Sequence, residues 1–146
     1  MGHRTVLGIT AVGIALVSSG CSASTAAPTN QPLTITYVEN GEPVSAPVVI
    51  EGVDCQIDDT SSIYSNIGGD TGFNAVLGQV NDRKTYTVSV QISADRGFIS
   101  AKEFDVTADG LRFDDTLGRV AALEGNDVTD VIDSAATLTG AITCDN

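Results

Sequence analysis

The sequence predicts a mainly β protein: a single small antiparallel β-sandwich or open barrel, with room for one short helix, closed by one disulfide. Apolar and polar residues alternate with a period of two along several segments, which is typical of strands that bury one face. Turn-forming residues recur about every ten positions, as they do in antiparallel sandwiches. Two cysteines, Cys55 and Cys144, bracket almost the whole of this region.

The segments expected to form strands are rich in β-branched residues. They are 33–38, 47–52, 86–92, 98–106 and 136–144. The turn signals between them are Asn40-Gly41, Gly68-Gly69-Asp70, Asn81-Asp82, Asp109-Gly110 and Gly125-Asn126-Asp127. Two further segments, 73–80 and 117–124, could each be a short helix or a strand, because periodicity does not separate the two at that length.

The first twenty residues have the layout of an export signal. Arg4 precedes an uncharged apolar run over 6–17, and the small residues Ser18-Ser19-Gly20 follow it. A membrane span needs about 20 apolar residues, so this run is too short to be a permanent transmembrane helix. We therefore expect residues 1–20 to be a signal peptide that is removed on export.

Cys21 stands directly after this signal. Ser18-Ser19-Gly20-Cys21 resembles the lipobox of bacterial lipoproteins, in which the cysteine sulfur is acylated and the signal is cut just before it, although Ser18 replaces the usual Leu. Each buried methylene adds about 0.8 kcal/mol of membrane affinity, and stable anchoring takes more than one acyl chain. We expect Cys21 to be the lipidated first residue of the mature protein. The alternatives are an ordinary secreted protein and an uncleaved anchor.

Residues 21–32 are expected to form a flexible tether. This stretch contains no apolar side chain larger than Ala or Pro beyond Cys21, so it cannot bury enough surface to offset its ordering entropy. Ser and Thr beside Pro also occur in O-glycosylated stalks, with a plain spacer as the simpler alternative. The remaining residues, 33–146, are expected to form one β-rich extracytoplasmic domain.

The cysteine count predicts one disulfide. With Cys21 acylated, Cys55 and Cys144 are the two that remain, and in an oxidising compartment they are expected to pair. Closing so long a loop stabilises a domain by about 4 to 5 kcal/mol in the chain-entropy model, which is substantial for a small core. The alternative is a reactive thiol at one of the two positions.

The charge balance excludes one class of partner. Nineteen acidic residues outweigh seven basic ones, for a formal net charge of −12. Binding to nucleic acid needs clustered Lys and Arg, so nucleic acid is not an expected partner. The same charge repels anionic lipid headgroups, so we expect the folded body to stand off the membrane, held only by its acyl chains.

Imidazole chemistry is also excluded. His3 is the only histidine and lies in the expected signal, so the mature protein would have none. Ser-His-Asp and Cys-His catalysis and His-containing zinc sites all need an imidazole. We therefore expect neither kind of catalysis and no His-containing metal site. Our overall expectation is a protein without enzymatic activity, cofactor or metal site, and the enzymatic alternative is a carboxylate hydrolase that acts on envelope polysaccharide.

The carboxylate motifs have simpler explanations than catalysis. Asp70-Thr71-Gly72 matches the short motif of aspartic proteases, but two facing copies are needed and a turn explains it better. Calcium loops follow a D-x-[DN]-x-[DN]-G pattern that is missing here, and glycoside hydrolysis needs two carboxylates facing each other across a cleft. The acidic clusters, expected to be mostly solvated, are Asp58-Asp59, Asp114-Asp115 and the series Asp127, Asp130, Asp133.

Several short motifs occur in a distinctive order. They are the lipobox at Cys21, the Ser/Thr/Ala/Pro tether, Val48-Val49-Ile50-Glu51-Gly52, Cys55, Thr71-Gly72-Phe73-Asn74-Ala75-Val76-Leu77 and Ile142-Thr143-Cys144. This order resembles the mycobacterial 19-kDa lipoprotein antigen family, in which V-V-I-D-G, T-G-x-x-A-V-L and V-T-C recur. The chain departs from the family in its shorter tether, in Glu51 for Asp, and in the closeness of Cys55 to the preceding strand.

The resemblance implies a non-enzymatic cell-envelope lipoprotein, held on the extracytoplasmic side of the cell membrane by acylated Cys21 and exposed as a surface antigen. It also implies recognition by host innate immune receptors through the acyl chains. In the tether it implies that Ser24, Thr25 and Thr29 are candidate O-glycosylation sites. An alternative function is an envelope carrier of lipid or another apolar ligand, with a cavity between sheets or beneath a short helix.

Overall fold

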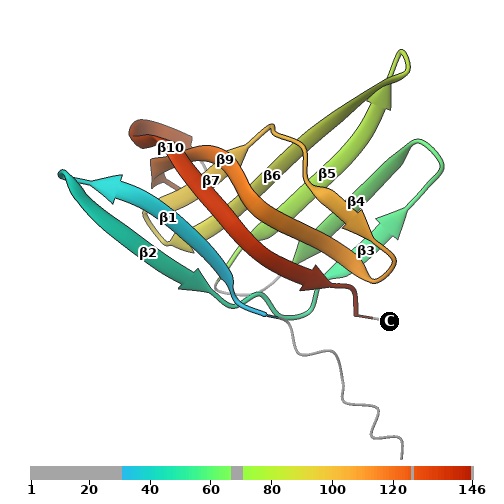
Figure 1. The fold of residues 1–146 in the computed structure, drawn as a ribbon, viewed down its shortest axis with the longest axis horizontal. Helices are drawn as coiled ribbons and strands as arrows, with labels where there is room; N and C mark the ends of the chain where they lie inside the picture. The colour runs from blue at the N-terminus through green and yellow to red at the C-terminus, as the bar shows by residue number, and fades with distance from the viewer. Residues whose placement is uncertain (1–30, 67–70, 126, 146) are drawn as a thin grey trace, which may run out of the picture.

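The structure is a computed structural model that describes residues 31–66, 71–125 and 127–145 (Figure 1). Every regular element in these residues is a strand of one antiparallel sheet. The strands are β1 (Leu33–Glu39), β2 (Glu42–Val48), β3 (Asp54–Ile57), β4 (Ser61–Asn66), β5 (Phe73–Val80), β6 (Arg83–Ser93), β7 (Arg96–Ser100), β8 (Asp105–Thr107), β9 (Gly110–Glu124) and β10 (Asp127–Thr143). The predicted antiparallel β class is confirmed, and the sheet stays open instead of closing into a barrel.

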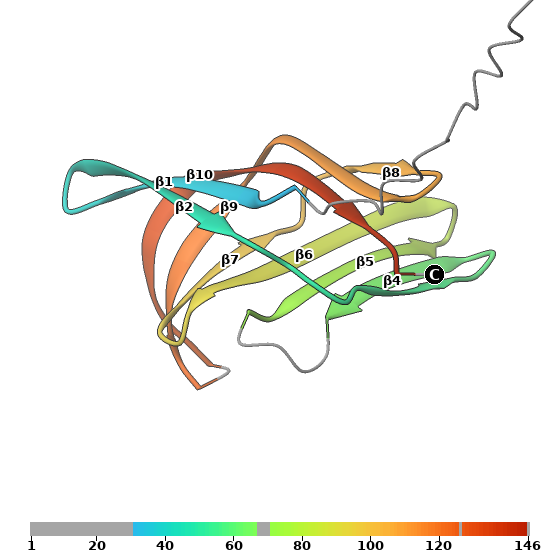
Figure 2. The same ribbon diagram turned by 90° about the horizontal axis from the view of Figure 1, so that it is seen from below.

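The sheet order is β2-β1-β10-β9-β7-β6-β5-β4-β3, with β8 paired to β9 alone. Strands β3 to β7 follow one another as a meander, whereas the first strand returns to pair with the last, Ile35 opposite Leu138. In Figure 2 the layer of β1, β2 and β10 lies above the layer of β4, β5 and β6. The sheet therefore folds over, and its two ends face each other across the core.

The core lies between these two layers. Alternate residues of β1, β2 and β6 point inward, which is the period-two pattern expected from the sequence. The inward residues include Leu33, Ile35, Leu138 and Ile142 from one layer and Tyr64, Ala75, Val88 and Val90 from the other. Phe113 lies between two other rings, 6.4 Å from Phe73 and 5.4 Å from Phe104 between centroids, so aromatic contacts join the layers.

Residues 49–53 connect the two edge strands, β2 and β3. Ile50 and Val53 are fully buried in the core, and the Val53 carbonyl accepts a hydrogen bond from the Asp145 N–H at 3.0 Å. This connection therefore covers one end of the core.

The prediction of a strand over 47–52 is wrong beyond Val48, where β2 ends. The apolar run that suggested a strand serves instead to bury Ile50 in the core from an irregular connection, in which Gly52 has a positive φ of 66°.

The two ambiguous segments are both strands. Residues 73–80 form β5, which pairs with β4 on one side and β6 on the other. Residues 117–124 belong to β9, which pairs with β10 and β7. Local periodicity does not distinguish a helix from a strand here, and hydrogen bonds with two neighbouring strands select the strand. The described residues contain no helix.

The expected strand over 98–106 is broken in two. β7 ends at Ser100 and β8 begins at Asp105, and the break between them places Phe104 in the core. Strands β3 and β4 were not predicted, because the serine-rich segment of β4 lacks the β-branched composition of a typical strand.

Two turn signals work as expected. Asn40 and Gly41 have φ values of 54° and 84°, and Asn81 and Asp82 have 49° and 60°, as in the two-residue hairpin turns that need positive φ at both positions. Gly110, with a φ of 155°, begins β9 after the Asp109-Gly110 turn. The 68–70 signal and Asn126 lie outside the described residues.

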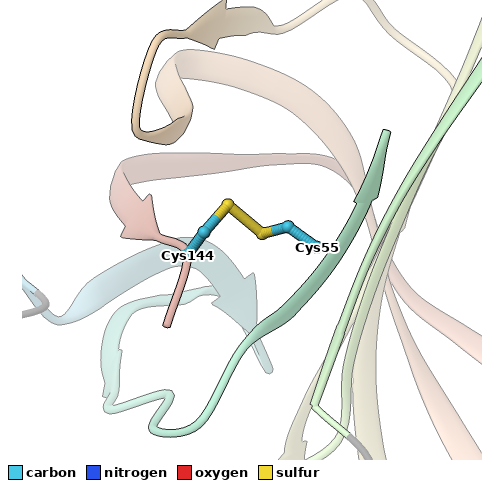
Figure 3. Close-up of a disulfide and its surroundings, with 2 residues drawn as sticks. All are labelled: Cys55 and Cys144. Carbon is cyan, nitrogen blue, oxygen red and sulfur yellow. A yellow bond between two sulfur atoms is a disulfide. The ribbon is translucent and has the colours of Figure 1, made fainter. Parts of the chain in front are cut away.

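The predicted disulfide joins Cys55 on β3 to Cys144, which follows the end of β10 (Figure 3). Their Cα atoms are 5.7 Å apart, although 89 positions separate them in the chain. β3 is an edge strand and pairs only with β4, whereas β10 lies near the opposite edge. The bond therefore ties one layer to the other where no ladder of hydrogen bonds does so.

Removing both cysteines of this pair, with Cys55→Ser and Cys144→Ser together, should lower the free energy of unfolding by about 4 kcal/mol. The double variant avoids leaving one free thiol. Urea unfolding followed by circular dichroism measures the change. Cys21→Ser is the matched control and should leave the unfolding midpoint unchanged; equal midpoints for all three proteins would contradict the bond's role.

Gly118 should tolerate no side chain. A Cβ there would lie 2.6 Å from the Ile99 carbonyl oxygen and would meet the Phe98 ring. Gly118→Ala should therefore destabilise the fold by about 1 to 3 kcal/mol through overpacking. At Gly72 the nearest atom is the flexible end of Gln91, at 3.1 Å, so Gly72→Ala is the control with a smaller loss. Comparable losses in urea unfolding would refute this packing argument.

Candidate functional site

Several predicted site residues lie outside the described residues. These are Cys21, Ser24, Thr25, Thr29 and Asp70. Thr71 is described, and its hydroxyl donates to the Val49 carbonyl at 3.1 Å. Of the residues singled out from the sequence, the structure brings together only the disulfide pair, Cys55 and Cys144.

The acidic clusters are spread over different parts of the sheet. Within the described ranges, no three His, Cys, Asp or Glu residues converge as they would around a metal ion. The first pair follows β3, the second lies within β9, and the series of three runs along β10. Their members are Asp58-Asp59, Asp114-Asp115 and Asp127, Asp130, Asp133.

The Asp133 carboxylate accepts hydrogen bonds from two backbone N–H groups. One of its carboxylate oxygens accepts from the Val38 N–H at 2.7 Å and the other from the Ala135 N–H at 2.8 Å. The β9–β10 register shifts on both sides of Asp133, as at a β-bulge, where ladder bonds are lost. The carboxylate thus supplies partners for backbone donors at the bulge and attaches β10 to β1.

An ion pair connects the sheet at another point. The Arg96 guanidinium on β7 lies 2.7 Å from the Glu39 carboxylate on β1, and both side chains are partly exposed. This hydrogen bond raises the pKa of Arg96 above its usual value. A second bond, from the Ser93 hydroxyl, lowers the pKa of the exposed Asp95 carboxyl. The first contact links β7 to β1, and the second lies at the turn between β6 and β7.

Two concavities lie on the sheet face turned away from the core. One row of paired residues crosses β4, β5, β6, β7 and β9 on this face, next to the inward row that contains Tyr64, Ala75 and Val88. The outward row is Ser65, Asn74, Ser89, Ile99 and Arg119. It passes from hydroxyl and amide groups to an apolar residue and then to a cation.

The first concavity, here called the neutral groove, has a volume of about 600 Å³. No Asp, Glu, Lys or Arg lines it, although the chain is strongly acidic. Its polar side chains are Gln56, Ser65, Asn66, Asn74, Ser89 and Gln91. Its apolar side chains include Ile63, Ile99, Leu123 and Val128, the last two from the β9–β10 hairpin.

The second concavity, here called the cationic groove, has a volume of about 630 Å³. Lys102 and Arg119 are its charged residues, and no carboxylate is part of its lining. The other side chains are small or apolar: Thr87, Ile99, Ser100, Ala101, Leu117, Ser134 and Ala135. Because Ile99 lines both grooves, the two adjoin on the outward face.

Neither groove was predicted from the sequence. The carrier hypothesis placed a cavity between sheets or beneath a helix, whereas these grooves lie on the outer face of one sheet. The available signal was the outward positions of the strands, where Thr87, Ser89 and Gln91 alternate with core residues and carry no charge. This uncharged row does not by itself predict a groove, because only strand pairing places it beside Ile99 and Arg119.

Comparisons with protein-family models, with curated proteins and with solved structures find no match for this chain. Across the described residues, no helix is long and apolar enough to cross a membrane.

Asp133→Ala should lower the free energy of unfolding by about 1 kcal/mol, because the exposed Val38 and Ala135 N–H groups exchange their carboxylate partner for water. Asp127→Ala, on the exposed end of the same strand, is the control and should change it by less than about 0.5 kcal/mol. Urea unfolding with and without calcium measures both. A calcium-dependent loss at Asp133 would instead indicate a cation site.

Proposed function

We propose that this protein is a cell-envelope lipoprotein without enzymatic activity. Acyl chains on Cys21 anchor it to the extracytoplasmic side of the cell membrane, and the β-domain is presented outside. The observation that carries the proposal is the Cys55–Cys144 bond. Structural disulfides are typical of exported proteins, so the bond supports interpretation of residues 1–20 as an export signal.

The pairing also supports acylation of Cys21. Three cysteines occur in the chain, and the disulfide uses two of them. A third thiol left free in an oxidising compartment would be open to oxidation and mispairing, and acylation of Cys21 removes that hazard.

The tether has a suitable length for this arrangement. β1 begins at Leu33, so twelve positions separate its first residue from Cys21. A chain of that length reaches at most about 40 Å. The acidic domain therefore has room to stand off an anionic headgroup layer while it remains attached.

The surface role comes from the resemblance to the mycobacterial 19-kDa lipoprotein antigens. It extends the proposal to recognition of the acyl chains by host innate receptors and to O-glycans on Ser24, Thr25 or Thr29. The acidic surface supports solubility at a crowded cell surface and opposes contact with nucleic acid.

The intact mass of the protein extracted from membranes tests the proposal directly. We expect a chain that begins at Cys21 and carries two or three acyl groups. Alkylation should add no group before reduction and two groups after it, at Cys55 and Cys144. An unacylated mass would contradict the anchor.

Membrane fractionation of a Cys21 variant is a second test of lipid anchoring. Cys21→Ser should move the protein out of the membrane fraction, because its acyl chains supply the membrane affinity. The matched control, Cys55→Ser with Cys144→Ser, should stay with the membrane. Retention of Cys21→Ser in the membrane would overturn lipid anchoring.

A further inference from the structure

The cationic groove concentrates positive charge on a negative protein. Seven Lys and Arg stand against nineteen Asp and Glu in the chain, yet Lys102 and Arg119 line one groove that no carboxylate lines. Among the described residues, both ion pairs belong to Arg96. Lys102 and Arg119 therefore have no counter-ion there from the chain itself.

Apolar side chains stand beside these two cations. Leu117 is 53% exposed, and Ile99 and Ala101 line the same groove. An apolar surface next to unpaired cations suits a ligand that is apolar along its length and anionic at one end.

The groove is attached to fixed parts of the sheet. The Ser100 hydroxyl donates to the Leu117 carbonyl at 2.5 Å and accepts from the Lys102 N–H at 3.0 Å. These bonds tie the backbone that carries Lys102 to β9, which carries Arg119. On the core side the Phe98 ring lies close against Gly118, which leaves no space for a Cβ at this position of β9.

We propose that the cationic groove binds an amphipathic anion. A phosphate or carboxylate head lies between Lys102 and Arg119, where charge-assisted hydrogen bonds are the strongest available. The apolar chain lies along Leu117 and Ile99 and extends toward the neutral groove, which Ile99 also lines. Charge complementarity selects this location, because carboxylates elsewhere on the surface repel an anion.

This binding does not depend on acylation of Cys21, so either proposal can fail without the other. The protein to use is the chain from residue 21 with Cys21→Ser, which contains every described strand and the whole buried core. Omitting the acyl chains prevents them from competing for the groove.

Four probes distinguish the contribution of the anionic head group to binding from that of the apolar chain. Dodecyl phosphate and dodecanoate, below their micelle concentrations, carry both parts. Dodecyl maltoside has the tail without the charge, and inorganic phosphate has the charge without the tail. Isothermal titration should give binding of the two amphipathic anions at least about tenfold tighter than that of either control probe. A preference between the two anions identifies the head group.

Charge reversal tests the location. Lys102→Glu with Arg119→Glu should weaken dodecyl phosphate binding by at least about tenfold. Arg83→Glu with Lys84→Glu makes the same charge change at the exposed start of β6, outside both grooves, and should have little effect. Leu117→Ser should weaken dodecyl phosphate binding but leave the response to inorganic phosphate unchanged. Circular dichroism confirms that each variant folds.

Three results would overturn the proposal. If dodecyl maltoside bound as tightly as dodecyl phosphate, the site would be apolar with no role for the two cations. If inorganic phosphate bound as tightly as dodecyl phosphate, the groove would be an anion site with no role for an apolar chain. Unchanged dodecyl phosphate binding in the folded double charge-reversal variant would place the ligand elsewhere.

Discussion

The disulfide between Cys55 and Cys144 holds an open sheet folded over its own core. The ladder alone does not bring β3 to β10, because they lie six places apart in the sheet order. Besides the disulfide, two further contacts join the same parts: the connection over 49–53, which buries Ile50 and Val53, and the backbone bond between Asp145 and Val53. Covalent closure at this point allows about a hundred residues to keep a shared core between two layers.

The same closure determines which surfaces remain free. Inward side chains of both layers fill the core, and the two grooves lie on the outward face. The neutral groove crosses β3 to β7 beside the end of the β9–β10 hairpin, and the cationic groove is lined by β6, β7, β9 and β10. The edge strand β2 carries Pro43 and Pro47, which weaken its capacity to pair with another strand and so oppose edge-to-edge aggregation. The outward face is thus a more suitable binding surface than this edge.

Sequence patterns predicted some elements well and missed others for identifiable reasons. Alternation over 33–38 and 86–92 predicted β1 and β6 because each strand buries one face. The run over 47–52 misled because burial of Ile50 in an irregular connection selects the same apolar residues as a strand does. The serine-rich β4 was missed because its strand state depends on pairing with β3 and β5.

The sequence by itself determined the antiparallel β class and, with Cys21 taken as acylated, the partner of each remaining cysteine. Both follow from order along the chain: alternation of side chains specifies a half-buried strand, and a cysteine count leaves few pairings. Only the tertiary structure decided the role of Asp133 and the meeting of Lys102, Leu117 and Arg119 in one groove. Those arrangements depend on strand register and on bulges, because a shift of one residue would turn the same side chains to the opposite face.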